Sequence, residues 1–177
     1  MSCKITWFGH AAFGLETGGY HILVDPFFSG NPAASTDGEG LPADFILVTH
    51  GHSDHVGDTV AIARRTGALV ISNNEIHKWL AEKDIRTHGQ HIGGGHQHPF
   101  GYLKLTCALH GSALPDGAYG GNPAGLLITT NDGIKIYIAG DTGLFGDMRL
   151  IGEEGIDLAV LPIGDNYTMG PPDALRA

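Results

Sequence analysis

The feature that most constrains this chain is a strand pattern that runs directly into a group of metal-binding side chains. Phe45–Thr49 is a continuous run of apolar and β-branched residues, typical of a strand buried on both faces. The next six residues read His50-Gly51-His52-Ser53-Asp54-His55. Residues two apart in an extended segment point to the same side, so His50 and His52 can bind one cation together.

Asp54 and His55 follow where the chain turns into a predicted helix, so they can face a second cation beside the first. Zinc binds imidazole nitrogen and carboxylate oxygen at about 2.0–2.2 Å, which suits all four groups. Taken alone, Asp54 could equally cap a helix, and a single histidine after a strand is more often solvated. Four such residues in six positions favour a metal site.

Alternation and turn signals predict an α/β layered fold in a single domain over residues 1–177, since a chain of 177 residues can bury one core. The expected strands are Lys4–Phe8, Ala12–Glu16, His21–Asp25, Phe45–Thr49, Ala68–Ser72, Gly101–Ala108, Gly125–Thr130, Lys135–Ala139 and Asp157–Pro162. The expected helices are Val56–Arg65, Glu75–Glu82, Phe145–Gly152 and a helix that starts in Pro171–Ala177. Ser29–Leu41 and His88–His98 are expected to be loops.

The net charge of −9 argues against binding to nucleic acid, so we expect a small-molecule substrate. The N-terminal MSCKITWFGH lacks the pattern of a signal peptide, and no apolar run approaches a membrane span. We therefore expect a cytoplasmic protein without membrane contact, and leave homo-oligomer formation open. Cys3 and Cys107 have no metal-binding spacing and are expected to be small buried side chains.

Several segments together resemble one family. The HxHxDH pattern of residues 50–55 resembles the metallo-β-lactamase superfamily. Other segments resemble its small, single-domain metal-dependent hydrolases, distant relatives of L-ascorbate-6-phosphate lactonase. These are Trp7–His10, Leu23–Pro26, Ala108–Ser112, Tyr119–Gly125, Ala139–Gly143 and Pro162–Gly170.

The resemblance implies a four-layer αββα sandwich with two divalent metal ions. The expected metal is zinc, with manganese or iron as alternatives. It implies that His50, His52 and His110 hold the first metal and that Asp54 and His55 hold the second. Asp141 would bridge both, and Asp54 and Asp141 would be the catalytic carboxylates.

One departure from the family pattern concerns the second metal. The family has a further histidine on a late strand, whereas no histidine follows His110 here. We therefore expect a domain that lacks the C-terminal end of the family fold and holds the first metal more firmly than the second.

Four further residues are candidates for supporting roles. His10 is expected either beside the metals or as a capped loop histidine, and Asp25 either orients a ligand histidine or forms an Asp-Pro turn. Asn122 lies in a glycine-rich loop that either contacts substrate or only turns the chain, and Asp165 either lines the pocket or supports a subunit contact. The histidines His88, His91, His96 and His98 are expected to be solvated loop residues.

Two cations that share a water lower its pKa from 15.7 toward about 7, which gives hydroxide at neutral pH. The sequence therefore predicts a hydrolase that uses a metal-bound hydroxide on a small ester, lactone, amide or phosphoester. The alternatives are a phosphodiesterase or nuclease and a non-catalytic metal-binding sensor domain.

Overall fold

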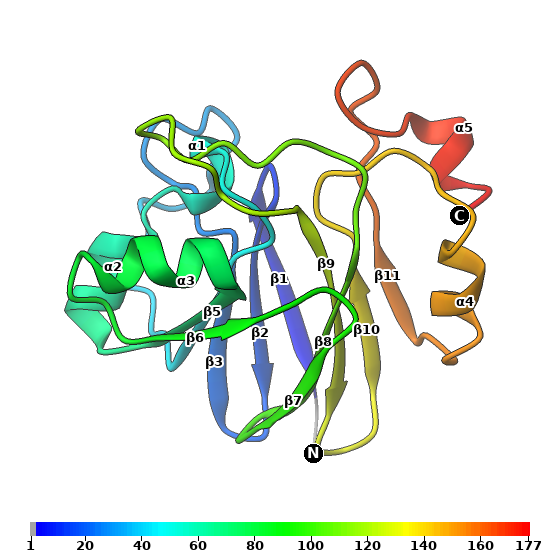
Figure 1. Ribbon diagram of the computed structural model, residues 1–177. Coiled ribbons are helices and arrows are strands. Elements are labelled where there is room, and N and C mark those ends of the chain that lie inside the picture. Colours follow the sequence, from blue (N-terminus) through cyan, green and yellow to red (C-terminus); the bar gives the residue numbers. More distant parts are fainter. Residues whose placement is uncertain (1–2) are drawn as a thin grey trace.

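The computed structural model describes residues 3–177, which form two β-sheets packed face to face with helices on the outside (Figure 1). The first sheet has six strands in chain order: β1 (Lys4–Gly9), β2 (Ala12–Thr17), β3 (Tyr20–Val24), β4 (Phe45–Leu47), β5 (Leu69–Asn73) and β6 (Thr87–Gln90). Strands β1 to β3 pair antiparallel, and β3 to β6 pair parallel.

The second sheet has five strands in the order β11-β10-β9-β8-β7. Their bounds are β7 (Gly95–His98), β8 (Gly101–Cys107), β9 (Ala124–Thr130), β10 (Lys135–Ile138) and β11 (Leu158–Val160). Strands β8 and β10 run in the same direction because each pairs antiparallel with β9 between them. The segments after β8 and after β10 therefore leave the sheet at the same end.

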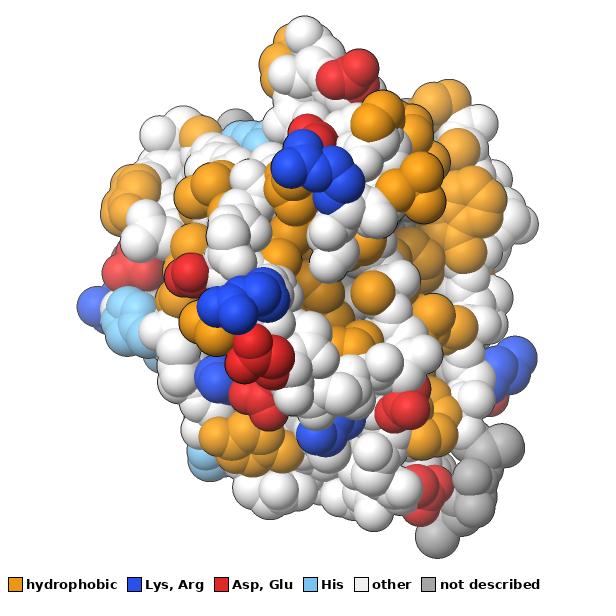
Figure 2. All heavy atoms as spheres, turned by 90° about the vertical axis from the view of Figure 1, so that its right-hand side faces the viewer, with side chains coloured by type: hydrophobic (Ala, Val, Ile, Leu, Met, Phe, Trp, Pro, Cys, Tyr) orange, Lys and Arg blue, Asp and Glu red, His pale blue; other side chains and the backbone are white. Residues whose placement is uncertain are grey.

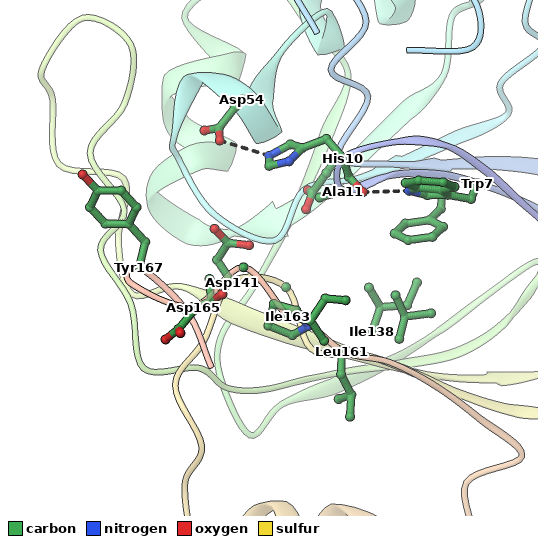
Figure 3. Close-up of a pocket in the computed structure, with 17 residues that line it drawn as sticks. Trp7, His10, Ala11, Asp54, Ile138, Asp141, Leu161, Ile163, Asp165 and Tyr167 are labelled. Atoms are coloured by element: carbon green, nitrogen blue, oxygen red, sulfur yellow. Dashed lines mark hydrogen bonds and ion pairs between the residues drawn. The ribbon is translucent and has the colours of Figure 1, made fainter. Parts of the chain in front are cut away.

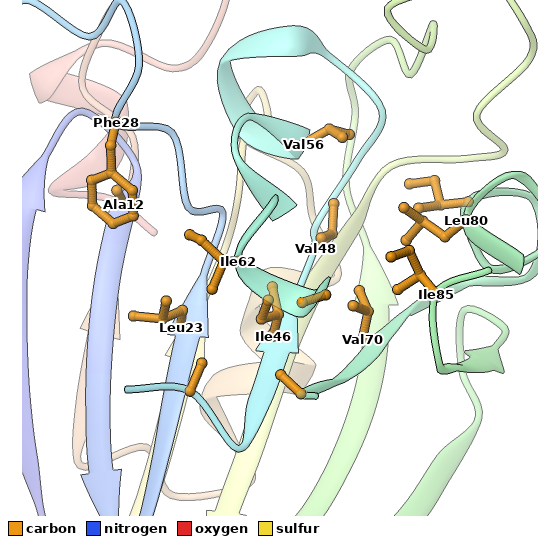
Figure 4. Close-up of a cluster of buried hydrophobic side chains, with 14 of the residues drawn as sticks. Ala12, Leu23, Phe28, Ile46, Val48, Val56, Ile62, Val70, Leu80 and Ile85 are labelled. Atoms are coloured by element: carbon orange, nitrogen blue, oxygen red, sulfur yellow. The ribbon is translucent and has the colours of Figure 1, made fainter. Parts of the chain in front are cut away.

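Alternating side chains along the strands separate the core into layers. Phe45 and Leu47 of β4 pack between the sheets, while Ile46 faces the outer helices. The outer layer of the first sheet consists of α1 (Ser53–Val56), α2 (Thr59–Thr66) and α3 (Asn74–Ala81), and Figure 4 shows its apolar contacts. On the other side, α4 (Met148–Gly152) packs its Ile151 against the five-stranded sheet, and α5 (Pro171–Ala174) follows near the end of the chain. The predicted αββα sandwich is confirmed.

Two element predictions were wrong. The expected helix Val56–Arg65 is two helices, α1 and α2, because Gly57 interrupts it with a φ of 40° and a ψ of −125°. The expected loop 88–98 contains most of β6 and all of β7, which are edge strands that pair through the backbone. The other predicted elements are present with shifted ends.

Two further expectations concern the cysteines and the membrane. Cys3 and Cys107 are free and half-buried rather than buried. Among residues 3–177, no helix combines the length and the apolar character that crossing a membrane requires.

Candidate metal centre

The predicted ligands of residues 50–55 lie just beyond β4, where the chain leaves the sheet and enters α1. His50 and His55 are fully buried, and His52 is the N-cap residue of α1. His50 Nε2 lies 3.1 Å from His52 Nδ1. A tetrahedral zinc would hold two imidazole nitrogens about 3.3 Å apart, so this pair is already spaced as two ligands of one cation.

His110 reaches the same place from the segment after β8. Its ring centre is 5.1 Å from that of His50 and 4.9 Å from that of His52. One ring nitrogen of each of these three histidines lies within 4.8 Å of the others. The set predicted for the first metal therefore comes together from two sheets.

Asp141, just after β10, lies between the two predicted ligand sets. Its Oδ2 atom is 3.5 Å from His55 Nε2 and 3.6 Å from His110 Nε2. Asp54, His55 and His10 form another group whose ligand atoms lie within 4.8 Å of one another. Asp141 therefore lies close to one histidine of each predicted ligand set.

Asp25 determines which nitrogens of the buried histidines face the centre. Its Oδ2 accepts a hydrogen bond of 2.6 Å from the Thr49 hydroxyl and lies 2.8 Å from His55 Nδ1. Since the Thr49 proton goes to Asp25, the 3.0 Å contact between Thr49 Oγ1 and His50 Nδ1 requires the histidine to donate. Both rings are therefore held through Nδ1 and direct Nε2 toward the centre.

The charge balance of the buried histidines differs between the two ligand sets. Burial and the neighbouring His55 lower the pKa of His50 to about 2, so its ring is neutral. Burial also lowers the pKa of His55, but Asp25 and Asp141 outweigh this effect and raise it to about 10. The carboxylates around His55 thus favour a positive charge, which a proton or a metal cation can supply.

Besides the distances between the ligand atoms, a second observation indicates that these residues can hold a metal. His55 Nε2 is buried and lies 3.5 Å from the carboxylate of Asp141 without forming a hydrogen bond, which is costly for a polar atom unless something binds between the two groups. The donor set of imidazoles and carboxylates is one that zinc, manganese and iron accept. We call His50, His52, Asp54, His55, His110 and Asp141, as the candidate ligands, the metal centre.

His10 lies beside the metal centre, the first of its two predicted positions. Its Nε2 is 3.1 Å from Asp54 Oδ2, and this contact holds the pKa of Asp54 well below its usual range (Figure 3). The loop conformation of His10, with a φ of 53°, is held by a hydrogen bond of 2.8 Å from Trp7 Nε1 to its carbonyl oxygen. Asp54 therefore remains ionised next to His55.

Ser112 is a supporting residue to which sequence reasoning assigned no role, although it ends the quoted segment Ala108–Ser112. Its Oγ accepts a hydrogen bond of 2.9 Å from Gly51 N and donates one of 2.9 Å to Gly120 O. A Cβ on Gly51 would lie 3.0 Å from Ser112 O, so the two segments meet backbone to backbone. This contact joins the loop of His110 to the segment of His50 and His52.

A hollow of about 590 Å³ adjoins the metal centre between β1 and β11, the end strands of the two sheets. Asp54, Asp141 and His10 lie at one side of it, with Asp165 and Tyr167 near Asp141 (Figure 3). Its apolar wall comprises Trp7, Phe13, Ile138, Val160, Leu161 and Ile163. Figure 2 shows hydrophobic side chains gathered on this side of the molecule.

Of the two remaining predicted residues, Asp165 and Asn122, only Asp165 lines the hollow. Asp165 lines the hollow, in a turn where its own φ is 58°. Asn122 does not line it: its side chain is exposed and its Oδ1 lies 3.3 Å from the hydroxyl of Tyr119. Its carbonyl oxygen accepts a hydrogen bond of 3.0 Å from Asn73 Nδ2, which ties the loop to the start of α3.

Comparison with known proteins identifies the family of this chain. The Beta-lactamase superfamily domain matches residues 20–177. The UPF0173 metal-dependent hydrolase YtkL of Bacillus subtilis is 52% identical over 180 residues, which cover 98% of this chain and 79% of that protein.

Solved structures show the same fold. Igni18, a metallo hydrolase from Ignicoccus hospitalis, is 40% identical with a TM-score of 0.88, over 98% of this chain and 76% of that one. A Thermotoga maritima protein assigned to the metallo-β-lactamase superfamily is 25% identical with a TM-score of 0.61, over 99% and 69%. The chain belongs to the β-lactamase superfamily and, within it, to the UPF0173 metal-dependent hydrolases.

Proposed function

We propose that this hydrolase holds two divalent cations, preferably zinc, and cleaves a small ester, lactone, amide or phosphoester. His50, His52 and His110 would hold the first cation, Asp54 and His55 the second, and Asp141 would contact both. The observation that carries the proposal is the convergence of these side chains on one small, largely buried region from segments that follow β4, β8 and β10.

The cation pair would supply a shared water with a pKa lowered toward about 7. The protein's own residues do the positioning. Asp25 holds His50, through Thr49, and His55 with their Nε2 atoms toward the centre. His10 keeps the carboxylate of Asp54 in place.

The lining of the hollow beside the metal centre favours a small substrate that has an apolar part. A wall of mostly apolar side chains would hold that part, while Asp54 and Asp141 lie at the side where the bond would be cleaved. Asp165, on the rim near Asp141, is the group we assign to contact a polar part of the substrate.

The experiment is hydrolysis by the metal-stripped protein after reloading with zinc, manganese or iron(II). The panel comprises bis-p-nitrophenyl phosphate, p-nitrophenyl esters and a set of lactones. We expect turnover of at least one class that chelation abolishes and that His110→Ala and Asp141→Ala reduce by at least 100-fold. His91→Ala, an exposed histidine outside the centre, is the matched control.

A metal-loaded protein that turns over nothing in the panel would contradict the proposal and favour a non-catalytic metal-binding role. Metal titrations of His52→Ala and Asp54→Ala give a separate readout of the two positions, because each variant removes a ligand of one position only. We expect one tightly held cation at the first position and a weaker second one, and equal tight binding at both would overturn that difference.

A further inference from the structure

Three further histidines gather where the outer strands of the two sheets meet. His88 is on β6, the last strand of the six-stranded sheet, and His96 and His98 are on β7, the last strand of the five-stranded sheet. Their ring centres are 4.4, 4.7 and 5.0 Å apart, and one ring nitrogen of each lies within 4.8 Å of the others. We call His88, His96 and His98 the edge histidines.

The edge histidines are separate from the metal centre. They share no residue with it, and β7 lies at the opposite end of the molecule from α1, which carries Asp54 and His55 (Figure 1). They line a different hollow, of about 420 Å³, together with Asp44 and Arg86. Whatever the edge histidines bind is therefore independent of the hydrolytic site.

His98 is held in an orientation that suits a ligand. Gln90 Nε2 donates a hydrogen bond of 3.1 Å to Leu103 O, so the Gln90 amide oxygen faces the ring and accepts from His98 Nε2 at 3.1 Å. The proton is thereby on Nε2, and Nδ1 keeps its lone pair. Phe100 stacks on the same ring at 5.3 Å with an angle of 5° between the planes.

This arrangement has the parts of a metal site. Both His98 and Gln90 are buried, and a metal-binding histidine characteristically donates its other ring N–H to a fixed acceptor. Burial and the neighbouring His88 and His96 lower the pKa of His98 to about 4, so this ring is neutral at physiological pH. Three crowded imidazoles with free lone pairs are a donor set that zinc, copper(II) and nickel(II) prefer.

We propose that His88, His96 and His98 bind a divalent transition-metal cation that joins the outer edges of the two sheets. A tetrahedral zinc would bring the nitrogens about 3.3 Å apart, which requires only a small closing movement. The exposed side chain of His96 can provide that movement. The cation would cross-link β6 and β7, which belong to different sheets and are joined along the chain by a short turn.

The test is the zinc content of the metal-stripped chain after reloading and removal of loosely bound metal. We expect His88→Ala and His96→Ala each to bind one equivalent less than the wild type. His91→Ala removes an exposed histidine from the turn between β6 and β7, so it should bind as much zinc as the wild type. Hydrolysis should be unchanged in all three variants, because the metal centre is intact.

A spectroscopic measurement isolates this site. In a His52→Ala/Asp54→Ala/His110→Ala background, which removes ligands from both positions of the metal centre, one copper(II) should give an electron paramagnetic resonance spectrum with nitrogen couplings from imidazole. Adding His96→Ala should weaken that binding by at least tenfold, whereas adding His91→Ala should not. Equal zinc contents in the wild type and all single variants, or a copper spectrum unaltered by His96→Ala, would overturn the proposal.

Discussion

The Oδ2 atom of Asp25 lies 2.8 Å from Nδ1 of His55, and both side chains are buried, with 1% and 0% of their surface exposed. This pair connects the end of β3 with the first turn of α1, which places the second ligand set relative to the sheet. Through Thr49, the same carboxylate also reaches His50. One buried acidic residue therefore orients a histidine of each predicted metal position.

Asp25→Asn tests this orientation without straining the backbone. Asp25 has a φ of 43°, which asparagine tolerates, but an amide cannot accept all three hydrogen bonds that the carboxylate accepts. We expect metal affinity to fall by about 10- to 100-fold, the usual effect of losing such a partner. Competition against a chromophoric chelator measures it, with the exposed Asp157→Asn as the control. Unchanged affinity would show that Asp25 does not position the ligands.

Ser112→Ala tests the contact between the two ligand segments. It leaves the amide of the buried Gly51 without its acceptor, which costs about 1–3 kcal/mol of unfolding free energy. We also expect weaker binding at the first metal position, because the loop of His110 loses its anchor to the segment of His50. Urea unfolding and metal titration, compared with Ser29→Ala on the surface, check both parts. Lower stability with unaltered metal binding would limit Ser112 to a structural role.

Gly57→Ala tests the sharp turn that ends α1. A Cβ there would lie 2.6 Å from both Phe27 Cα and Pro26 O, at a φ of 40°. We expect destabilisation of more than about 2 kcal/mol and loss of the second cation, since α1 must move with His55. Gly19→Ala is the matched control, because Gly19 has a φ of 83° and no atom near the added Cβ. Equal effects of the two changes would show that backbone strain, and not the clash, is responsible.

The raised pKa of the Tyr137 hydroxyl predicts that the folded protein loses stability at alkaline pH. Burial raises the pKa of its hydroxyl from about 10 to about 12 and outweighs the smaller, opposite effect of the neighbouring Thr106. The unfolded chain therefore loses this proton first, so the contribution is fully present below pH 10 and disappears as the pH rises through 12. The loss amounts to about 2–3 kcal/mol.

Unfolding free energies of the wild type and Tyr137→Phe, measured from pH 8 to pH 12, isolate this contribution. The variant should match or exceed the wild type at pH 8 and lose less stability above pH 10. Parallel curves for the two proteins would contradict the assignment.

The sandwich and the candidate ligand segment 50–55 could be predicted because their signals are local. Strand alternation and turn residues, such as Gly18-Gly19, depend on neighbours in the chain. Residues 50–55 combine four ligand types in one short segment, and the resemblance supplied His110 and Asp141.

The remaining features depend on contacts between distant segments. Ser112 acts on Gly51, 61 residues away, and Asp25 acts on Thr49, 24 residues away. Strands β6 and β7 were missed because edge strands rich in glycine and histidine lack apolar alternation. The edge histidines consequently looked like solvated loop residues, and only the meeting of the two sheets brings them together.

The most direct test of the metal centre is anomalous diffraction at the zinc edge from crystals of the zinc-loaded protein. We predict one strong peak among His50, His52 and His110 and a weaker one at Asp54 and His55, with the carboxylate of Asp141 between them. No anomalous density within bonding distance of these six side chains, in crystals that hold zinc elsewhere, would contradict the account.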